Sequence, residues 1–285
     1  MANKICNYFN KDIKELFVND DIQETLSEKT IKHHHDLIST VLSTAVEWNL
    51  ITNSPAERVK SPKVSKKKPI YYDDNQVLQL FLLLEDQPLK YKTAIYLTID
   101  TGLRLSEIAG LEWNDIDFEN NALEINKQRQ YVAGYGTLIK QPKTENGNRY
   151  ASISETVINM LKKLRIEQKE NRLKMGELWT SSNNIFIHED GKPMHPHRPY
   201  KWLTEFLKQN NLDTITFHAL RHTNASLLIA AGMDIVTLSG RLGHSDKNVT
   251  LNTYSHVIRS KEKQASTMME QFYPASKDIN MPKAE

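Results

Sequence analysis

A cluster of basic side chains with helical spacing lies in the segment HALRHTNASLLIAAG. His218, Arg221 and His222 occupy positions i, i+3 and i+4, so a helix places all three on one face. Two histidines four residues apart can bind a metal, but the glutamate of the HExxH zinc motif is absent because position 219 is alanine. Two imidazoles around one guanidinium instead favour an anion as the ligand.

Single residues of reactive type occur in three other segments. Arg104 lies in TGLRLSEIAGL, where Glu107 follows it by one helical turn. Lys143 lies in KQPKTENGNR, beside an Asn-Gly pair, and His244 begins the stretch HSDKNVTLNTY that ends at Tyr254. Each of these residues alone is typical of a solvated loop, a surface helix or a half-buried packing position.

In combination, these segments resemble the pattern of the tyrosine recombinase (phage integrase) family. That pattern consists of TGxR, a lysine on a β-hairpin, HxLRH, LGH, and a tyrosine about ten residues later in YxH. The resemblance extends over about residues 69–273, and its most specific parts are HALRH and LGHSDKNVTLNTY. The residues that carry it are, in chain order, Arg104, Lys143, His218, Arg221, His244 and Tyr254. It implies an enzyme that cuts and rejoins double-stranded DNA at specific recombination sites.

The resemblance assigns the nucleophile and the groups that move protons. Tyr254 is implied to attack a DNA phosphodiester, which gives a 3′-phosphotyrosine and a free 5′-hydroxyl. The phosphotyrosine keeps the energy of the broken strand, so no ATP is expected, and the sequence has no GxxxxGK[ST] phosphate loop. Lys143 is implied as the general acid for the leaving 5′ oxygen, and His218 as the base for Tyr254.

The other residues of the pattern are implied to stabilise charge. Arg104, Arg221 and His244 would donate hydrogen bonds to the non-bridging phosphate oxygens. Guanidinium groups that never lose their charge would take the place of a metal, so we expect no metal and no cofactor. Glu107 and His222 are expected to support the site by orienting these donors.

The same resemblance implies partners beyond the DNA site. We expect a homo-tetramer on DNA, with accessory DNA-bending or directionality factors as further candidate partners and a phage or transposon as the origin. Three alternatives remain open at this point: a chromosome-dimer-resolving recombinase, a type IB topoisomerase, and a non-catalytic, truncated DNA-binding remnant.

The elements that must position these residues are mostly helical, and the expected class is mainly α with a small antiparallel β-sheet (α+β). Ser27 is expected to cap a helix that extends to Trp48, and Asp73 with Gln76 to form a capping box. Further helices are expected at Arg104, after Asp246, and over residues 91–99, 155–173, 200–209 and 217–231. Strands are expected within residues 111–126 and on both sides of Asn146-Gly147, as a hairpin whose rising arm carries Lys143.

Proline and lysine together indicate a domain boundary. Residues 55–68 contain six cations and one acid, a net charge of +5, which leaves −3 for the rest of the chain. Together with the family resemblance, this boundary predicts a partial helical core-binding (SAM-like) domain at 1–60, a basic linker at 61–69, a catalytic domain at 70–258 and a tail helix at 259–285. Within the linker, Lys66, Lys67 and Lys68 are expected to contact DNA phosphates.

Both ends of the chain carry further expectations. The part before the linker has roughly half the residues that the resemblance leads us to expect, so the chain looks N-terminally truncated. In the tail, one apolar stripe at i, i+3, i+4, i+7 and i+8 predicts a helix, and the pattern alone fits packing on its own domain at least as well as contact with another chain. The resemblance implies that this helix contacts a neighbouring subunit. The residues of this stripe are Ala265, Met268, Met269, Phe272 and Tyr273.

Composition excludes several other classes of protein. No run approaches the roughly 18 to 20 apolar residues of a membrane span, and charges interrupt the N-terminus where a signal peptide needs an apolar core. The single cysteine, Cys6, excludes an internal disulfide, so the bacterial cytoplasm is the expected location.

Overall fold

The computed structural model describes residues 26–65, 70–141, 148–243, 250–251 and 253–254. The chain divides into two compact units, residues 1–67 and 68–285.

The first unit contains helix α3 (Glu28–Glu47) and the short 3-10 helix η1 (Pro55–Arg58). Ser27 caps α3 by accepting a hydrogen bond from the backbone N–H of Thr30, as predicted. The chain after η1 contacts α3 through polar groups: the side chain of Lys32 donates to Ser61 Oγ over 3.2 Å, and a ring nitrogen of His35 lies 3.3 Å from the Val59 carbonyl oxygen.

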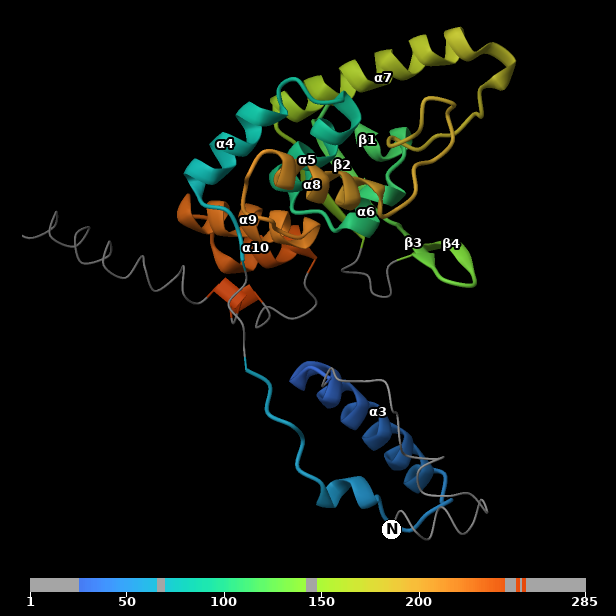
Figure 1. The fold of residues 1–285 in the computed structure, drawn as a ribbon, viewed down its shortest axis with the longest axis vertical. Helices are drawn as coiled ribbons and strands as arrows, with labels where there is room; N and C mark the ends of the chain where they lie inside the picture. The colour runs from blue at the N-terminus through green and yellow to red at the C-terminus, as the bar shows by residue number, and fades with distance from the viewer. Residues whose placement is uncertain (1–25, 66–69, 142–147, 244–249, 252, 255–285) are drawn as a thin grey trace, which may run out of the picture. The chain divides into compact units, whose positions relative to one another are not determined.

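The second unit is built mainly from helices (Figure 1). They are α4 (Asp74–Leu84), α5 (Leu89–Thr101), α6 (Leu105–Gly110), α7 (Glu155–Met175), α8 (Arg198–Gln209), α9 (Phe217–Ala230) and α10 (Ile235–Leu242), with the 3-10 turns η2 (Trp113–Asp115) and η4 (Gly176–Leu178). The predicted capping box of Asp73 and Gln76 starts α4. The sequence did not predict α10, which Asp234 caps.

Helix α5 lies at the centre of this unit. Eight of its thirteen residues are buried, and it packs against α7, α8 and α9. A helix that is apolar on most sides must be covered on most sides, so α5 fixes the positions of its neighbours. The packing of α5 therefore also fixes the position of its C-terminal end and of the segment that follows it.

The strands form two small antiparallel sheets in the described part of the chain. In the first sheet, β2 (Ala122–Ile125) pairs with both β1 (Ile116–Asp117) and β5 (Arg149–Ser152). The second consists of β3 (Gln128–Val132) and β4 (Gly136–Lys140), which form a hairpin that projects from the helices (Figure 1). The mainly α class with antiparallel sheet is confirmed, although we had predicted one sheet.

The predicted hairpin across Asn146-Gly147 is wrong for the described strands. The strand before this pair, β4, joins β3 through a tight turn in which Gly134 and Gly136 have positive φ. The strand after it, β5, pairs instead with β2, because its buried Ala151 opposes the buried Leu123 in the core. Lys143 itself, the start of the helix expected at Asp246 and the tail after Tyr254 lie outside the described residues.

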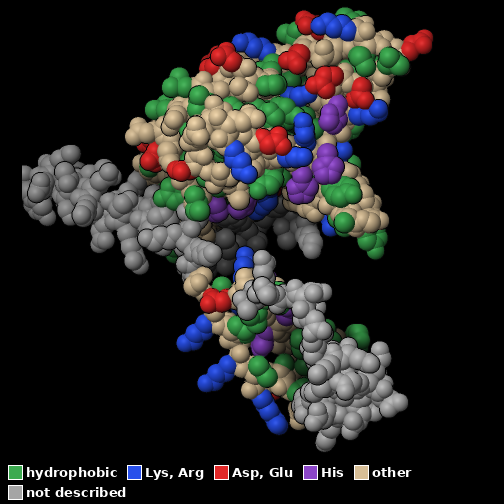
Figure 2. Space-filling model, viewed as in Figure 1, with side chains coloured by type: hydrophobic (Ala, Val, Ile, Leu, Met, Phe, Trp, Pro, Cys, Tyr) green, Lys and Arg blue, Asp and Glu red, His purple; other side chains and the backbone are tan. Residues whose placement is uncertain are grey.

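Charged side chains are mixed on the face of the second unit that Figure 2 shows, where Lys and Arg alternate with Asp and Glu. Among the described residues, no helix combines the length and the apolar character that a membrane span requires.

Candidate active site

Helix α9 carries the basic cluster that the sequence predicted. Thr216 caps it by accepting a hydrogen bond from the backbone N–H of Ala219 over 3.2 Å. Arg221 is only 2% exposed, and its two terminal nitrogens donate to the carbonyl oxygens of Gly102 over 2.7 Å and Leu242 over 2.6 Å. Its guanidinium thus connects the ends of α5 and α10.

Arg104 is brought to this place by the turn that ends α5. Gly102 adopts the left-handed conformation with φ 70°, and Arg104 then precedes α6 as its N-cap residue, not as a member of the helix as predicted. Its terminal nitrogens donate to Glu107 Oε1 over 2.8 Å and to the Gly243 carbonyl oxygen over 3.3 Å. About a third of the Arg104 side chain stays exposed, so it has donors available for a ligand.

Gly102 is required both for its conformation and for its lack of a side chain. A Cβ there would lie 2.6 Å from Leu242 Cδ2 and 2.8 Å from Asn224 Oδ1. We expect Gly102→Ala to lower the free energy of unfolding by about 2–4 kcal/mol, the sum of left-handed strain and overpacking. Gly134→Ala is the control, because φ is also positive there but nothing lies near the added Cβ, so the free energy of unfolding should fall by only about 1 kcal/mol. Equal decreases in chemical denaturation would contradict tight packing at Gly102.

Glu107 is buried beneath Arg104 and receives a second arginine, Arg149 from β5. Arg149 donates from its two terminal nitrogens to both carboxylate oxygens, over 3.0 and 2.9 Å. Burial opposes the ionisation of Glu107, but the hydrogen bonds and charges of Arg149 and Arg104 outweigh it and lower the pKa of Glu107 to about 2. The orienting role of Glu107 stays a prediction, and these contacts show which donors it would orient. Sequence reasoning missed Arg149.

Tyr254 is buried with its hydroxyl against α9. Its ring packs with Ala225, Ile229 and Leu238, and 1% of the residue is exposed. The hydroxyl lies 2.7 Å from Nδ1 of His222. Burial raises the pKa of Tyr254, and the positive charge of Arg221 reduces this shift only in part. The hydroxyl is therefore protonated in this conformation.

The two histidines of the cluster differ in what they contact. Their rings meet edge to face with centroids 4.8 Å apart, and burial, His218 and Arg221 lower the pKa of His222 to about 4. His222 is thus neutral at pH 7. Among the described residues, His222 and not His218 makes the hydrogen bond to the hydroxyl of Tyr254. His218 is exposed, and its pKa is lowered by partial desolvation and by the charges of Arg221 and Arg104.

Four of the six residues of the sequence pattern are described, and the structure brings all four to one place. Arg104 and Arg221 act electrostatically on each other, and Arg221 acts on Tyr254. His244 follows directly after Gly243, which accepts from Arg104, but His244 and Lys143 lie outside the described residues, as do Lys66, Lys67 and Lys68. Two guanidiniums and two histidines beside a tyrosine hydroxyl are groups that can donate hydrogen bonds to an anion.

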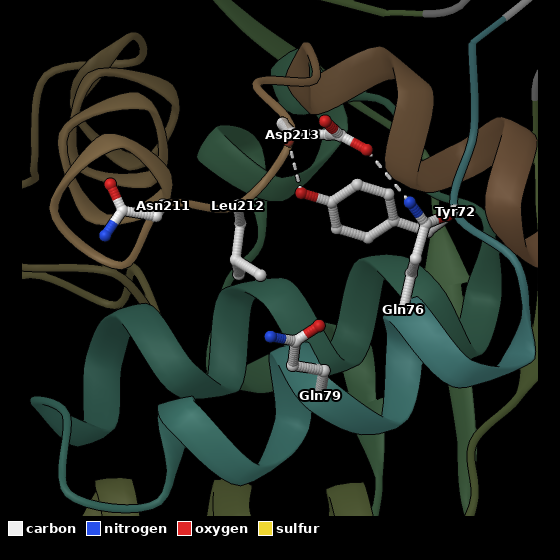
Figure 3. A pocket seen from close by; sticks show the side chains of 6 residues that line it. All are labelled: Tyr72, Gln76, Gln79, Asn211, Leu212 and Asp213. Atoms are coloured by element: carbon white, nitrogen blue, oxygen red, sulfur yellow. Dashed lines mark hydrogen bonds between the residues drawn. The ribbon is translucent and has the colours of Figure 1, made fainter.

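No group of three or more His, Cys, Asp or Glu side chains suited to a metal occurs among the described residues. A pocket of about 130 Å³ lies between α4 and the chain after α8, and no residue of the basic cluster lines it (Figure 3). Its lining has amides and one carboxylate but no cation; the lining residues are Tyr72, Gln76, Gln79, Asn211, Leu212 and Asp213. The side chain of Gln76 donates to the Asp213 carboxylate, and the hydroxyl of Tyr72 donates to the Asp213 carbonyl oxygen. The polar groups of this pocket thus bond to one another.

Comparison with known proteins shows the family of this chain. The model of the phage integrase family matches residues 71–261. The ICEBs1 integrase of Bacillus subtilis (strain 168) is 26% identical over 277 residues, which cover 92% of this chain and 75% of the relative. A tyrosine recombinase XerC-like protein of Caldanaerobacter subterraneus subsp. tengcongensis is 30% identical over 260 residues, 85% of this chain and 66% of the relative.

The solved structures show the same relationship. The Tn1549 transposon integrase in complex with transposon right end DNA superposes with a TM-score of 0.70 at 26% identity, over 85% of this chain and 80% of that one. The chain belongs to the phage integrase family. The resemblance read from the sequence and the prediction of an enzyme of the tyrosine recombinase class are thereby confirmed.

Proposed function

We propose that this protein is a site-specific DNA recombinase, an integrase of a phage or transposon, that cuts and rejoins DNA through a 3′-phosphotyrosine. The observation that carries the proposal is the meeting of Arg104, Arg221 and Tyr254 at the ends of α5, α9 and α10. A phosphodiester is an anion that two guanidiniums can bind with paired hydrogen bonds, and a hydroxyl beside them can attack its phosphorus.

In the proposed reaction, the Tyr254 oxygen forms a bond to phosphorus while the bond from phosphorus to the 5′ oxygen breaks. The proton of Tyr254 passes to a base, and Lys143 gives a proton to the 5′ oxygen that leaves. His222 already contacts the hydroxyl, so it is a second candidate for the base beside His218. Religation reverses these transfers with the 5′-hydroxyl of another strand as the nucleophile.

The raised pKa of the buried Tyr254 bears on this chemistry. Arg221 and Tyr254 are only 2% and 1% exposed, so a phosphate reaches neither group in this conformation, and DNA binding must uncover both before attack. Activation therefore requires both movement and a base.

A suicide half-site, nicked so that the cleaved end diffuses away, tests the proposal directly. We expect a covalent protein–DNA band on a denaturing gel, also in excess EDTA and without nucleotide, because fixed guanidiniums supply the positive charge. Binding without any covalent band would favour a non-catalytic DNA-binding remnant. Sequence-independent relaxation of supercoiled plasmid would favour a type IB topoisomerase. Activity that is confined to chromosomal dimer sites would favour a chromosome-dimer-resolving recombinase.

The basic linker at residues 61–69 is proposed to bind the DNA backbone. Replacing Lys66, Lys67 and Lys68 by glutamine should weaken binding to all sequences alike, because phosphate contacts carry no base information. The slope of log affinity against log salt should fall by roughly 0.9 for each phosphate that the variant no longer neutralises. Replacing Lys162, Lys169 and Lys174 of α7 is the control with the same change of charge. Equal slopes for the two triple variants would contradict the proposal.

The tail is proposed to join subunits into a homo-tetramer on DNA, where accessory DNA-bending or directionality factors would act. A contact of this heterologous kind closes a ring, so its removal opens every interface. Deletion of residues 260–285 should leave a folded protein that binds one half-site but forms no synaptic complex on native gels. Unfolding of the second unit, or tetramers in undiminished amount, would show that the tail belongs to its own subunit.

A further inference from the structure

Arg149, a buried cation of β5 that no motif singled out, contacts two separate parts of the candidate site. We propose that Arg149 is a positioning residue, which fixes Arg104 through Glu107 and fixes the turn at Gly243 through direct contact. The inference rests on the proposed function, because the residues that it positions are those assigned to phosphate binding.

The first contact is the paired hydrogen bond to Glu107. Both oxygens of this carboxylate are shared: Oε1 accepts from Arg149 and from the Arg104 side chain over 2.8 Å, and Oε2 accepts from Arg149 and from the Arg104 backbone N–H over 2.9 Å. Four hydrogen bonds therefore converge on one buried carboxylate. The Arg104 side chain cannot rotate without breaking its hydrogen bond to Glu107. Arg149 makes the second hydrogen bond to each oxygen of this carboxylate and so holds it in place.

The second contact is with the end of α10. The Nε of Arg149 donates to the Arg241 carbonyl oxygen over 2.9 Å. Gly243, left-handed with φ 65°, lies so close that an added Cβ would be 3.0 Å from Nη1 and 3.1 Å from Cδ of Arg149. The Gly243 carbonyl oxygen also accepts from Arg104 over 3.3 Å.

These contacts form a closed ring from Arg149 to Glu107, Arg104, Gly243 and back to Arg149. The ring joins β5, the start of α6 and the last turn of α10, and the chain enters His244 directly from it. Only a planar group with five N–H donors can hold a carboxylate with two bonds and a carbonyl with a third. A lysine would keep the charge but lose the geometry.

The decisive variants are Arg149→Lys, Arg149→Gln and a matched control, Arg241→Gln. Arg241 belongs to α10 and is also partly buried. Its side chain donates to the carbonyl oxygens of Asp100 in α5 and Ser152 in β5, and no hydrogen bond joins it to Glu107 or Arg104 in the described structure. The suicide half-site is used with each variant to measure half-site affinity, thermal midpoint and the single-turnover rate of covalent adduct formation.

We expect both Arg149 variants to bind the half-site within a few fold of the wild type and to cleave about 10- to 100-fold more slowly, as for a small misplacement of catalytic groups. Arg241→Gln should lower the thermal midpoint by about as much as the Arg149 variants do, yet it should cleave within about threefold of the wild-type rate.

The pH dependence adds a signature that a purely structural role would not produce. Glu107 faces Arg104, Arg149 and Arg221, and it is ionised throughout the working range because its pKa is about 2. Without Arg149, burial raises this pKa and the protonated form gains at low pH. The rate of Arg149→Gln, relative to the wild type at the same pH, should therefore fall further from about pH 8 to about pH 5.5.

The outcomes separate the two proposals. If the wild type forms no covalent adduct, the proposed function fails. If the wild type cleaves and Arg149→Lys cleaves at its rate, the positioning role is overturned. It is also overturned if both Arg149 variants unfold, or if Arg241→Gln slows cleavage as much at the same stability, since Arg149 would then be an ordinary core residue.

Discussion

Tyr254→Phe is expected to abolish the covalent protein–DNA band completely, because the variant lacks the only oxygen that can attack the phosphorus from this position. The phenyl ring keeps the packing against Ala225, Ile229 and Leu238. Among the described residues, the substitution removes the hydrogen bond to His222, worth about 1 kcal/mol. Affinity for the half-site should stay within a few fold of the wild type.

The measurement is a denaturing gel with the suicide half-site, beside a binding titration and a thermal melt. Tyr72→Phe is a matched control, since it removes the hydroxyl of another buried tyrosine, and that hydroxyl donates to the Asp213 carbonyl oxygen and to no residue of the basic cluster. It should keep the covalent band. A phenylalanine variant at 254 that still becomes linked to DNA would show that another residue is the nucleophile.

Arg221→Lys should reduce cleavage about 10²- to 10³-fold, the usual effect of removing one preorganised donor to a transition-state oxygen. Arg221 also has a structural task, because it donates to the carbonyl oxygens of Gly102 and Leu242. Lysine retains one charge but cannot make both of these bonds and hold a phosphate. Arg104→Lys is expected to have an effect in the same direction.

Arg241→Lys separates the structural part of this effect from the catalytic part. Like Arg221, Arg241 donates to carbonyl oxygens of neighbouring elements and so links those elements. Its replacement should lower the stability of the fold without a large decrease in the rate of cleavage. Rates are compared at a temperature where both variants are folded by circular dichroism. Cleavage by Arg221→Lys at the wild-type rate would remove Arg221 from the proposed mechanism.

Features that depend on a few neighbouring residues could be predicted from the sequence. The caps at Ser27 and Asp73 and the spacing of His218, Arg221 and His222 are local, so the predicted helices formed where expected. The family could be recognised for a related reason. Its short motifs keep their residue types and order along the chain even though the residues meet only in the folded protein.

Pairings between distant segments were decided by the tertiary structure. Strand β5 had two possible partners, and the core selected β2, because burying Ala151 against Leu123 outweighs the local preference of Asn-Gly for a tight turn. One feature could have indicated the role of Arg149. It lies on the same face of β5 as Ala151, and a charge on a buried face needs a buried partner.

The surroundings of Tyr254 are likewise a feature that the sequence did not predict. The sequence determined that a tyrosine follows LGH by ten residues, but His222 and Tyr254 are 32 residues apart and their contact depends on how Tyr254 packs against α9 and α10. Whether a histidine touches a hydroxyl is decided within about an ångström. Spacing along the chain therefore identified the reactive residue types, and packing of the helices decided which of them meet.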